Sequence, residues 1–233
     1  MKYKNVVSAV FLSRPNRFIA YVEINGATEI AHVKNTGRCR ELLVPGCTVY
    51  LAVSDDPKRK TKYDLIAVEK QREGKAPLMI NMDSQVANDV AGEWLHTADL
   101  FSEQAKIRRE VTYGTSRFDF YIEDGDRRAF LEVKGVTLEH DGVAMFPDAP
   151  TERGVKHVNE LAACVRDGFE AYVLFIVQMK DIDLVRPHYE MHEAFGEALC
   201  NAAENGVRVL AVDCVVTPDE IVPDAPVSVE LRK

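Results

Sequence analysis

The segment FLEVKG, residues 130–135, places a carboxylate and an ammonium group two positions apart in an otherwise apolar run. Residues two apart in a strand lie on the same face, so Glu132 and Lys134 are expected to point the same way. A preceding run, RFDFYI, carries Asp119 among aromatic residues. Two carboxylates beside a lysine are side chains that could hold a divalent cation and act on a phosphodiester.

A hairpin is expected to bring these two runs together. Asp124-Gly125 between them is a hairpin signal. A two-residue loop at 124 and 125 would pair Asp119 with Phe130 and leave Glu132 diagonal to it, whereas a four-residue loop would pair Asp119 with Glu132 directly. Either register predicts one face with Asp119, Glu132 and Lys134, and an odd-length loop or a bulge would break this arrangement. Strict alternation predicts the opposite face of RFDFYI to hold Phe118, Phe120 and Ile122.

Asp119 and Glu132 are the predicted metal ligands. Two carboxylates on a half-buried face repel each other unless a positive charge lies between them. Oxygen ligands favour Mg²⁺ or Mn²⁺, which bind one or two carboxylates and keep several waters. Lys134 would position, or help deprotonate, the water that attacks a phosphodiester. The alternative is a surface ion-pair network, since a Glu/Lys pair two apart is common on exposed strands.

A helix is expected to follow the catalytic strands, opening at Thr151 and ending at Gly168. Its polar stripe, at i, i+3, i+4 and i+7, consists of Arg153, Lys156, His157 and Glu160. Packed beside the strands, these side chains would hold a phosphate or orient the attacking water, with His157 a candidate general base. A solvated helix face is the alternative, and a lone histidine is more often structural.

The other elements predict two domains. Residues 1–80 hold five short β-branched runs separated by turn residues, with one helical turn around GRCRELL, which predicts a small five-stranded OB-like β-barrel. Residues 81–233 hold a helix capped by Asp83 or Ser84, the strand meander, the helix at 151–168, the apolar strand EAYVLFIVQ, a helix from about His188 to Asn205 and the strand VRVLAVDCVV. This order predicts an α/β domain with a mixed sheet.

Charge divides the chain in the same way. Residues 1–80 contain 14 Lys/Arg against 8 Asp/Glu, whereas residues 81–233 contain 15 against 29. The net charge of −8 therefore hides a basic module beside an acidic one, which suggests a part that binds polyanions. Independent drift of surface charge in the two halves explains the count equally well.

Basic side chains on loops of the barrel are the predicted DNA contacts. HVKNTGRCREL has no core role that we can assign, and it contributes His32, Asn35, Arg38 and Arg40. Arg17 and, in the second domain, Arg117 complete the predicted set. PKRKTK, at 57–62, is equally well explained as a solvated hairpin tip. Phe18 could stack on a base, but we expect it in the core.

Composition favours a soluble cytoplasmic protein with no membrane partner. The chain of 233 residues is 46% hydrophobic, sufficient for a sizeable core. Its longest apolar stretch, AYVLFIV, is far short of the roughly 20 residues of a membrane span. The N-terminus reads as a first strand and not as a signal peptide. Five scattered cysteines argue against a disulfide framework and a zinc site.

Four longer stretches carry a resemblance to a known family: NTGRCRELLVPG, SRFDFYI, EVKGVTL and MFPDAPTERGVKHVNEL. Over essentially the whole chain they resemble the sugar fermentation stimulation protein family, and RFDFYI with AFLEVKG is similar to the signature of the PD-(D/E)XK nuclease-like fold. The resemblance implies an OB-like domain, a nuclease-like domain, non-specific DNA binding and a regulatory link to maltose metabolism. Asp119, Glu132 and Lys134 match the nuclease positions, while Lys34 stands where we expect proline in many relatives.

Two functions from different classes follow. The first is a DNA-binding protein whose second domain is an Mg²⁺-dependent nuclease; the second is a DNA-binding regulator that retains the acidic site without turnover. A third is a module that binds proteins or carbohydrate through the barrel, which DNA binding without salt dependence would favour.

Overall fold

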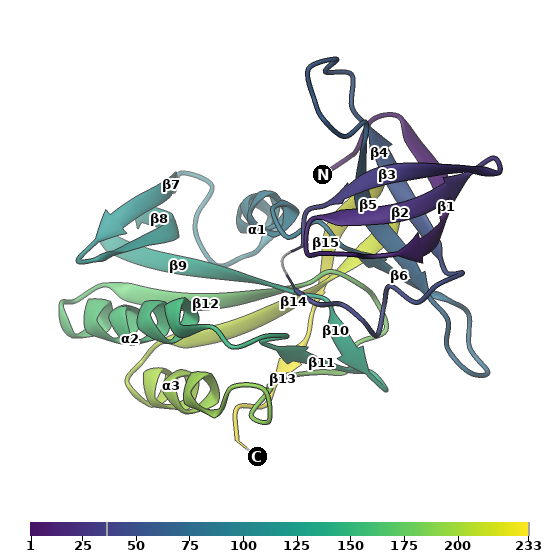
Figure 1. Ribbon diagram of the computed structural model, residues 1–233. Coiled ribbons are helices and arrows are strands. Elements are labelled where there is room, and N and C mark those ends of the chain that lie inside the picture. Colours follow the sequence, from purple (N-terminus) through teal and green to yellow (C-terminus); the bar gives the residue numbers. More distant parts are fainter. Residues whose placement is uncertain (36, 233) are drawn as a thin grey trace.

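The computed structural model describes residues 1–35 and 37–232 and begins with a closed barrel (Figure 1). Its strands are β1 (Val6–Ser13), β2 (Ile19–Ile24), β3 (Ala27–Val33), β4 (Thr48–Val53) and β5 (Tyr63–Lys70). They pair in the order β3-β2-β1-β4-β5, and a parallel pairing of β3 with β5 closes the barrel. The OB-like barrel of five strands predicted from the sequence is therefore confirmed.

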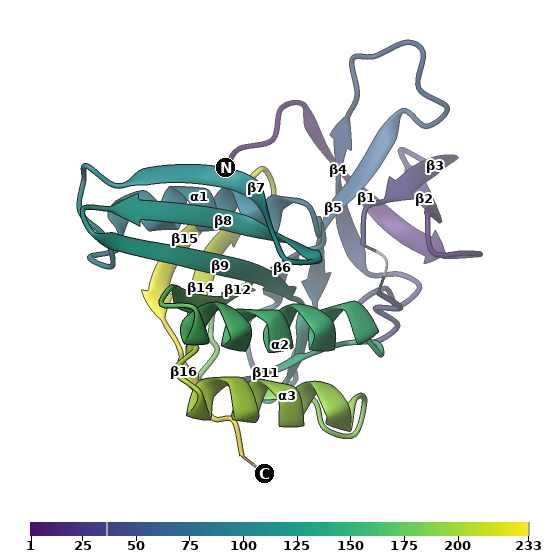
Figure 2. The same ribbon diagram turned by 90° about the vertical axis from the view of Figure 1, so that its left-hand side faces the viewer.

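The second half of the chain forms a mixed sheet, as predicted, and its six strands include one at Glu220–Pro226 that was not predicted. Its strands are β7 (Lys106–Tyr113), β8 (Ser116–Asp124), β9 (Arg127–Val136), β12 (Glu170–Val177), β14 (Arg208–Thr217) and β15 (Glu220–Pro226), in the order β15-β14-β12-β9-β8-β7. The central strands β9, β12 and β14 are parallel. Helix α1 (Val86–Thr97) covers one face, and α2 (Glu152–Arg166) and α3 (Glu193–Glu204) cover the other (Figures 1 and 2).

Two helix starts differ from the predictions. The N-cap of α1 is Gln85, which makes no side-chain cap bond, whereas Asp83 Oδ1 accepts from the Gln85 backbone N–H at 3.0 Å in the preceding turn. Helix α3 begins at Glu193 because residues 188–192 form a turn in which the His192 N–H donates to the His188 carbonyl. The start of α2 is confirmed, since Thr151 Oγ1 accepts from the Gly154 N–H at 3.0 Å.

A small four-stranded sheet was not predicted. It consists of β10 (Leu138–His140), β11 (Val143–Phe146), β13 (Leu184–Pro187) and β16 (Ser228–Val229), while β6 (Leu78–Asn81) adds to the barrel sheet beside β5. These strands have two to four residues, too few to show a periodic pattern.

Polar contacts join the barrel to the α/β domain. Lys34 donates to Asp83 at 3.0 Å, and Lys70 donates to the backbone oxygen of Glu139 at 2.8 Å. At the centre of the junction the buried Gln178 amide donates to both oxygens of Asn81 at 3.0 Å. Within the described residues, no helix is long and apolar enough to cross a membrane.

Candidate metal centre and nucleic-acid interface

The turn between β8 and β9 sets the position of the two candidate carboxylates. Asp124 pairs with Arg127 and Phe120 with Leu131, so the turn consists of two residues, Gly125 and Asp126. It is shifted by one residue from the loop expected at 124 and 125. Continued by one residue, this register places Asp119 opposite Glu132, the direct pairing that we had expected only from a four-residue loop.

Alternation along β8 breaks at Asp119, contrary to the prediction. Phe118 packs against Phe130 and His157 on the α2 side of the sheet, whereas Phe120 and Ile122 pack with α1 on the other side. At this break in the alternation, the Asp119 carboxylate bonds to helix α1 and to strand β9. Its Oδ1 accepts from Asn88 Nδ2 on α1 at 2.8 Å, and its Oδ2 accepts from the Val133 backbone N–H at 2.7 Å.

Glu132 lies on the α2 side of β9 and is only 4% exposed. Its Oε1 accepts from Lys134 Nζ and from His157 Nδ1, both at 2.6 Å. Its other oxygen, Oε2, is buried and has no hydrogen-bond partner among the described residues. Oε1 thus accepts two hydrogen bonds, whereas Oε2 accepts none from the described residues.

The tautomer of His157 follows from its second contact. Arg153 Nε, which can only donate, bonds His157 Nε2 at 3.3 Å. Nε2 is therefore the acceptor and Nδ1 carries the proton donated to Glu132. The imidazole is buried and packs edge-on against Phe118, with ring centroids 5.9 Å apart. The chain Arg153–His157–Glu132 fixes the orientation of the carboxylate.

Electrostatics act in opposite directions on the two carboxylates. Burial raises the pKa of Asp119, and the nearby negative charge of Glu132 raises it further. Burial also tends to raise the pKa of Glu132, but the hydrogen bond from His157 and the charge of Lys134 outweigh it and hold that pKa below its ordinary value. A cation beside Asp119 would offset the cost of ionising it.

The residues present fit a hard divalent cation. Oε2 of Glu132 is buried and has no partner among the described residues, so it is a free ligand atom. The charge of Glu132 acts on Asp119, and each oxygen of Asp119 keeps a lone pair beyond its hydrogen bond. The described residues contain no group of three or more His, Cys, Asp or Glu side chains placed to hold a metal. Two carboxylates with waters and a substrate phosphate suit Mg²⁺ or Mn²⁺, whereas a structural zinc site needs more protein ligands.

The polar stripe of α2 separates into two pairs. His157 bonds Glu132, and Arg153 bonds His157 from behind, as described above. Lys156 donates to the Thr115 carbonyl at 2.9 Å, and Glu160 accepts from Thr115 Oγ1 at 2.5 Å. Lys156 and Glu160 therefore hold the β7–β8 turn and do not contact the metal-ligand candidates.

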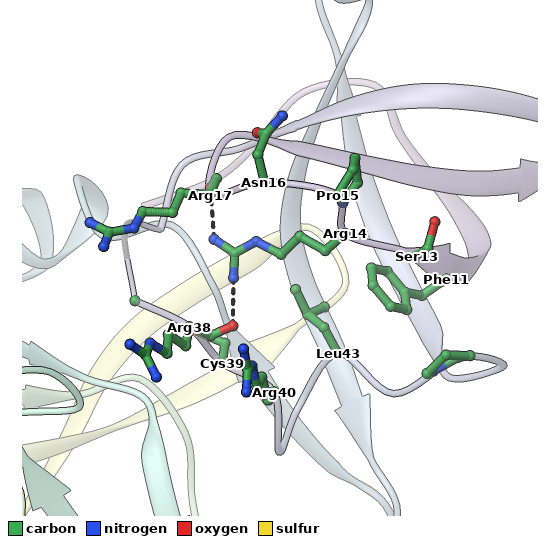
Figure 3. Close-up of a pocket in the computed structure, with 12 residues that line it drawn as sticks. Phe11, Ser13, Arg14, Pro15, Asn16, Arg17, Arg38, Cys39, Arg40 and Leu43 are labelled. Atoms are coloured by element: carbon green, nitrogen blue, oxygen red, sulfur yellow. Dashed lines mark hydrogen bonds between the residues drawn. The ribbon is translucent and has the colours of Figure 1, made fainter.

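Arginines line a pocket of the barrel, a cavity of about 540 Å³ (Figure 3). Arg14 is structural, because its guanidinium donates to the carbonyls of Arg17, Asn35 and Arg38 at 2.7–2.8 Å. Arg17, Arg38 and Arg40 are exposed, and within the described residues their side chains form no ion pair. Figure 3 shows Arg17 and Arg38 extending to the same side of the pocket.

The remaining predicted DNA contacts lie elsewhere. His32 bonds Asp64 at 3.2 Å, and Arg117 lies on β8 at 3.5 Å from Glu110. Asn35 is 7% exposed, and its Oδ1 accepts from the Gly37 N–H at 2.8 Å. Phe18, which we expected in the core, is 55% exposed and lies in the turn between β1 and β2.

Two roles were not foreseen. Asn88 is the partner of Asp119, and Arg14 organises the loops of the arginine pocket. Both depend on contacts between segments more than twenty residues apart, for which the local sequence carries no signal.

Comparisons with known proteins cover both halves of the chain. Residues 12–76 match the family model described as the SfsA N-terminal OB domain, and residues 85–220 match the sugar fermentation stimulation protein RE domain. A sugar fermentation stimulation protein homolog of Desulfitobacterium hafniense strain Y51 is 59% identical over 95% of this chain and 94% of its own length. The chain belongs to the sugar fermentation stimulation protein family. The Clostridium beijerinckii homolog is 53% identical over 95% of this chain and 96% of its own.

A solved structure of a family member has the same fold. SfsA of Pyrococcus furiosus, solved in complex with Ca²⁺, is 31% identical and superposes with a TM-score of 0.85 over 99% of this chain and 98% of its own. The two-domain architecture of the family is thus present in this chain from end to end.

Proposed function

We propose that this family member binds DNA without sequence preference and cleaves phosphodiester bonds with Mg²⁺ or Mn²⁺ held by Asp119 and Glu132. The proposal rests on the buried Oε2 of Glu132, which has no hydrogen-bond partner among the described residues. It rests equally on the second carboxylate, Asp119, whose pKa is raised by burial and by the charge of Glu132. The Pyrococcus furiosus relative forms a complex with Ca²⁺, which supports a divalent site in the family.

Each side chain of the centre has a role in this proposal. Asp119 and Glu132 would hold the cation, which when bound neutralises phosphate charge and lowers the pKa of a nearby water. Lys134, which donates to Glu132 at 2.6 Å, would hold the attacking water or a phosphate oxygen. His157, with Arg153 behind it, is a positioning residue that fixes Glu132 and is already committed as a hydrogen-bond donor.

The DNA contacts would come from the arginine pocket of the barrel. Exposed Arg17, Arg38 and Arg40 supply positive charge for the phosphate backbone, and exposed Phe18 offers a face on which a base can stack. The five free cysteines support a reducing compartment, so we place the protein in the cytoplasm.

A second candidate is a DNA-binding regulator, linked to sugar metabolism, without turnover. One observation favours it: the Lys134 ammonium pairs with the charge of Glu132, and the neutral His157 donates a hydrogen bond to the same carboxylate oxygen. Such a site is electrostatically stable as an ion-pair network.

Single-turnover cleavage separates the two candidates. Labelled single- and double-stranded DNA would be incubated with wild type, Asp119→Asn and Glu132→Gln over a titration of Mg²⁺ and Mn²⁺, and DNA affinity would be measured in EDTA. The proposal predicts metal-dependent cleavage in wild type, its loss in both variants, and unchanged DNA affinity. Wild-type binding without cleavage at any metal concentration would favour the regulator.

A further inference from the structure

A second cavity lies between the two domains and shares Lys134 with the metal centre. It measures about 210 Å³, below the roughly 300–1,000 Å³ of pockets that take drug-sized ligands. Its lining comes from the loop after β3, the start of the α1 segment, the end of β9 and the loop after β11. Because Lys134 bonds Glu132 at 2.6 Å, a group bound in this cavity lies next to the proposed reacting centre.

The polar lining offers both donors and acceptors of hydrogen bonds. Asn35 is 7% exposed and lines the cavity; its Oδ1 accepts from the Gly37 N–H, and its amide nitrogen is a donor. Thr137, also 7% exposed, lines the same cavity, and its hydroxyl can donate and accept. These groups suit a ligand that both donates and accepts hydrogen bonds.

The barrel loop and the loop after β11 are closely packed at the cavity. A Cβ placed on Gly37 would lie 1.8 Å from Asp148 Oδ2, so only glycine lets the barrel loop approach this carboxylate. Burial raises the pKa of Asp148, since its carboxyl group is desolvated at the domain junction. An amino group donated by a ligand would compensate this desolvation.

The chemistry of the lining favours an uncharged aromatic ring. Asp148 repels a second anion, so a phosphate is disfavoured inside the cavity. Leu138, Met145 and Phe146 supply apolar surface opposite the polar groups. A flat ring with donors and acceptors on its edge can bond to the polar lining and pack against the apolar lining. A nucleobase is bound in this way in proteins that recognise an extruded base.

We propose that this cavity binds the base of one unpaired nucleotide, so that single-stranded or frayed DNA, and not intact duplex, is the substrate of the neighbouring site. The assignment of a substrate rests on the proposed function; the base site itself does not. A paired base cannot reach the cavity without leaving the stack.

Ser84 allows a matched test, because it is exposed, lines the cavity and bonds the Lys34 carbonyl through its hydroxyl at 2.6 Å. Ser84→Trp would fill the cavity, and Ser84→Ala removes the same hydrogen bond without filling it. Saturation-transfer NMR with deoxyadenosine 5′-monophosphate, on the full chain in EDTA, would report contact with the adenine ring. Deoxyribose 5-phosphate, which lacks a base, and glucose are the control ligands.

The proposal predicts saturation transfer to the adenine protons in wild type and Ser84→Ala, and affinity weakened about tenfold or more in Ser84→Trp. Neither control ligand would displace the nucleotide. Absent transfer, equal binding by Ser84→Trp, or a preference for glucose or the base-free sugar phosphate would overturn it. Thermal unfolding of each variant shows whether it is folded; should Ser84→Trp unfold, Ser84→Phe replaces it.

Cleavage assays keep the two proposals distinguishable. If wild type cleaves DNA, single strands should be cut at least about tenfold faster than blunt duplex. Cleavage without adenine binding would remove the base site and leave the nuclease. Adenine binding without cleavage would remove the nuclease and leave a nucleotide site between the domains.

Discussion

His157 donates from Nδ1 to Oε1 of Glu132 at 2.6 Å, and both side chains are buried. This contact directs one oxygen of the carboxylate toward α2 and leaves the other without a partner among the described residues. A residue that holds a ligand in this way acts through the ligand's orientation, and its loss typically costs roughly 10–100-fold in metal affinity or activity.

His157→Leu is therefore expected to lower Mn²⁺ affinity and cleavage rate by roughly 10–100-fold. His157→Asn is the matched control, because its amide nitrogen can donate from about the position of Nδ1 and should restore most of the affinity. Calorimetric titration of Mn²⁺ and single-turnover cleavage measure the two effects. Wild-type metal affinity in His157→Leu would show that this hydrogen bond has no positioning role.

The pH dependence of metal binding should follow Asp119. Burial and the charge of Glu132 raise the pKa of Asp119, so Mn²⁺ affinity is expected to fall with decreasing pH already above the ordinary Asp pKa of about 3.9. The free energy of unfolding of the metal-free protein should change with pH in the opposite direction to the Mn²⁺ affinity. The contribution of Asp119 to stability is present at low pH and is lost as pH rises through the raised pKa.

Asn88→Ala tests the charge state of Asp119 by removing a hydrogen bond that the carboxylate accepts. The Asn88 hydrogen bond lowers the pKa of Asp119, so its removal should move the Mn²⁺-affinity profile to higher pH. Asn201→Ala, an exposed asparagine on α3, is the control. Superimposable profiles for wild type and Asn88→Ala would exclude the proposed effect of this bond on the Asp119 charge.

The ion pair between Lys70 and Glu139 should stabilise the junction of the two domains. Glu139 is 5% exposed; burial tends to raise its pKa, but the Gly142 N–H and the Lys70 ammonium outweigh burial and lower it. Lys70→Met leaves a buried carboxylate without its cation, which should lower the free energy of unfolding by about 2 kcal/mol at neutral pH.

The sign of the pH effect follows from the lowered pKa. The stabilisation by Glu139 is complete above its unfolded-state pKa, about 4.3, and is lost as pH falls through the lower folded-state value. Urea unfolding of wild type and Lys70→Met should therefore give curves that converge in acid. A gap of constant size from neutral to acidic pH would contradict this explanation.

The arginine pocket should bind DNA through phosphates. Arg38→Ala and Arg40→Ala are each expected to weaken binding uniformly across sequences and to reduce the slope of log affinity against log salt by about 1. Lys60→Ala, at the exposed tip between β4 and β5, is the control and should change neither quantity. An unchanged salt slope in Arg38→Ala would remove that residue from the contact set.

Local sequence patterns were sufficient for the barrel and for the strands of the candidate site. Strands β1 to β4 bury alternate residues on one face, which makes their periodicity of two visible. Strands β5 and β12 are buried along most of their length, which makes their sequences nearly continuous apolar runs. Phe118 was assigned to the wrong face because the contacts of Asp119 with α1 and β9 interrupt the alternation of β8. Periodicity cannot reveal such a tertiary effect.

The interdomain cavity lay beyond sequence reasoning for a similar reason. Gly37 and Asp148 are more than a hundred residues apart, and only the packed domains bring their loops together. The two stretches that contain them, NTGRCRELLVPG and MFPDAPTERGVKHVNEL, were singled out separately as family signatures. Their convergence beside Lys134 was not predicted.

The most direct test of the metal centre is a calorimetric titration of Mn²⁺ into the metal-free full chain and into Asp119→Asn and Glu132→Gln. Glu132→Gln replaces one oxygen of this carboxylate by an NH₂ group and removes its charge while nearly preserving the shape of the side chain. We expect one saturable site in the wild type and its loss in both variants. Thermal unfolding should show that both variants are folded like the wild type. Saturable binding of equal affinity in all three proteins would contradict it.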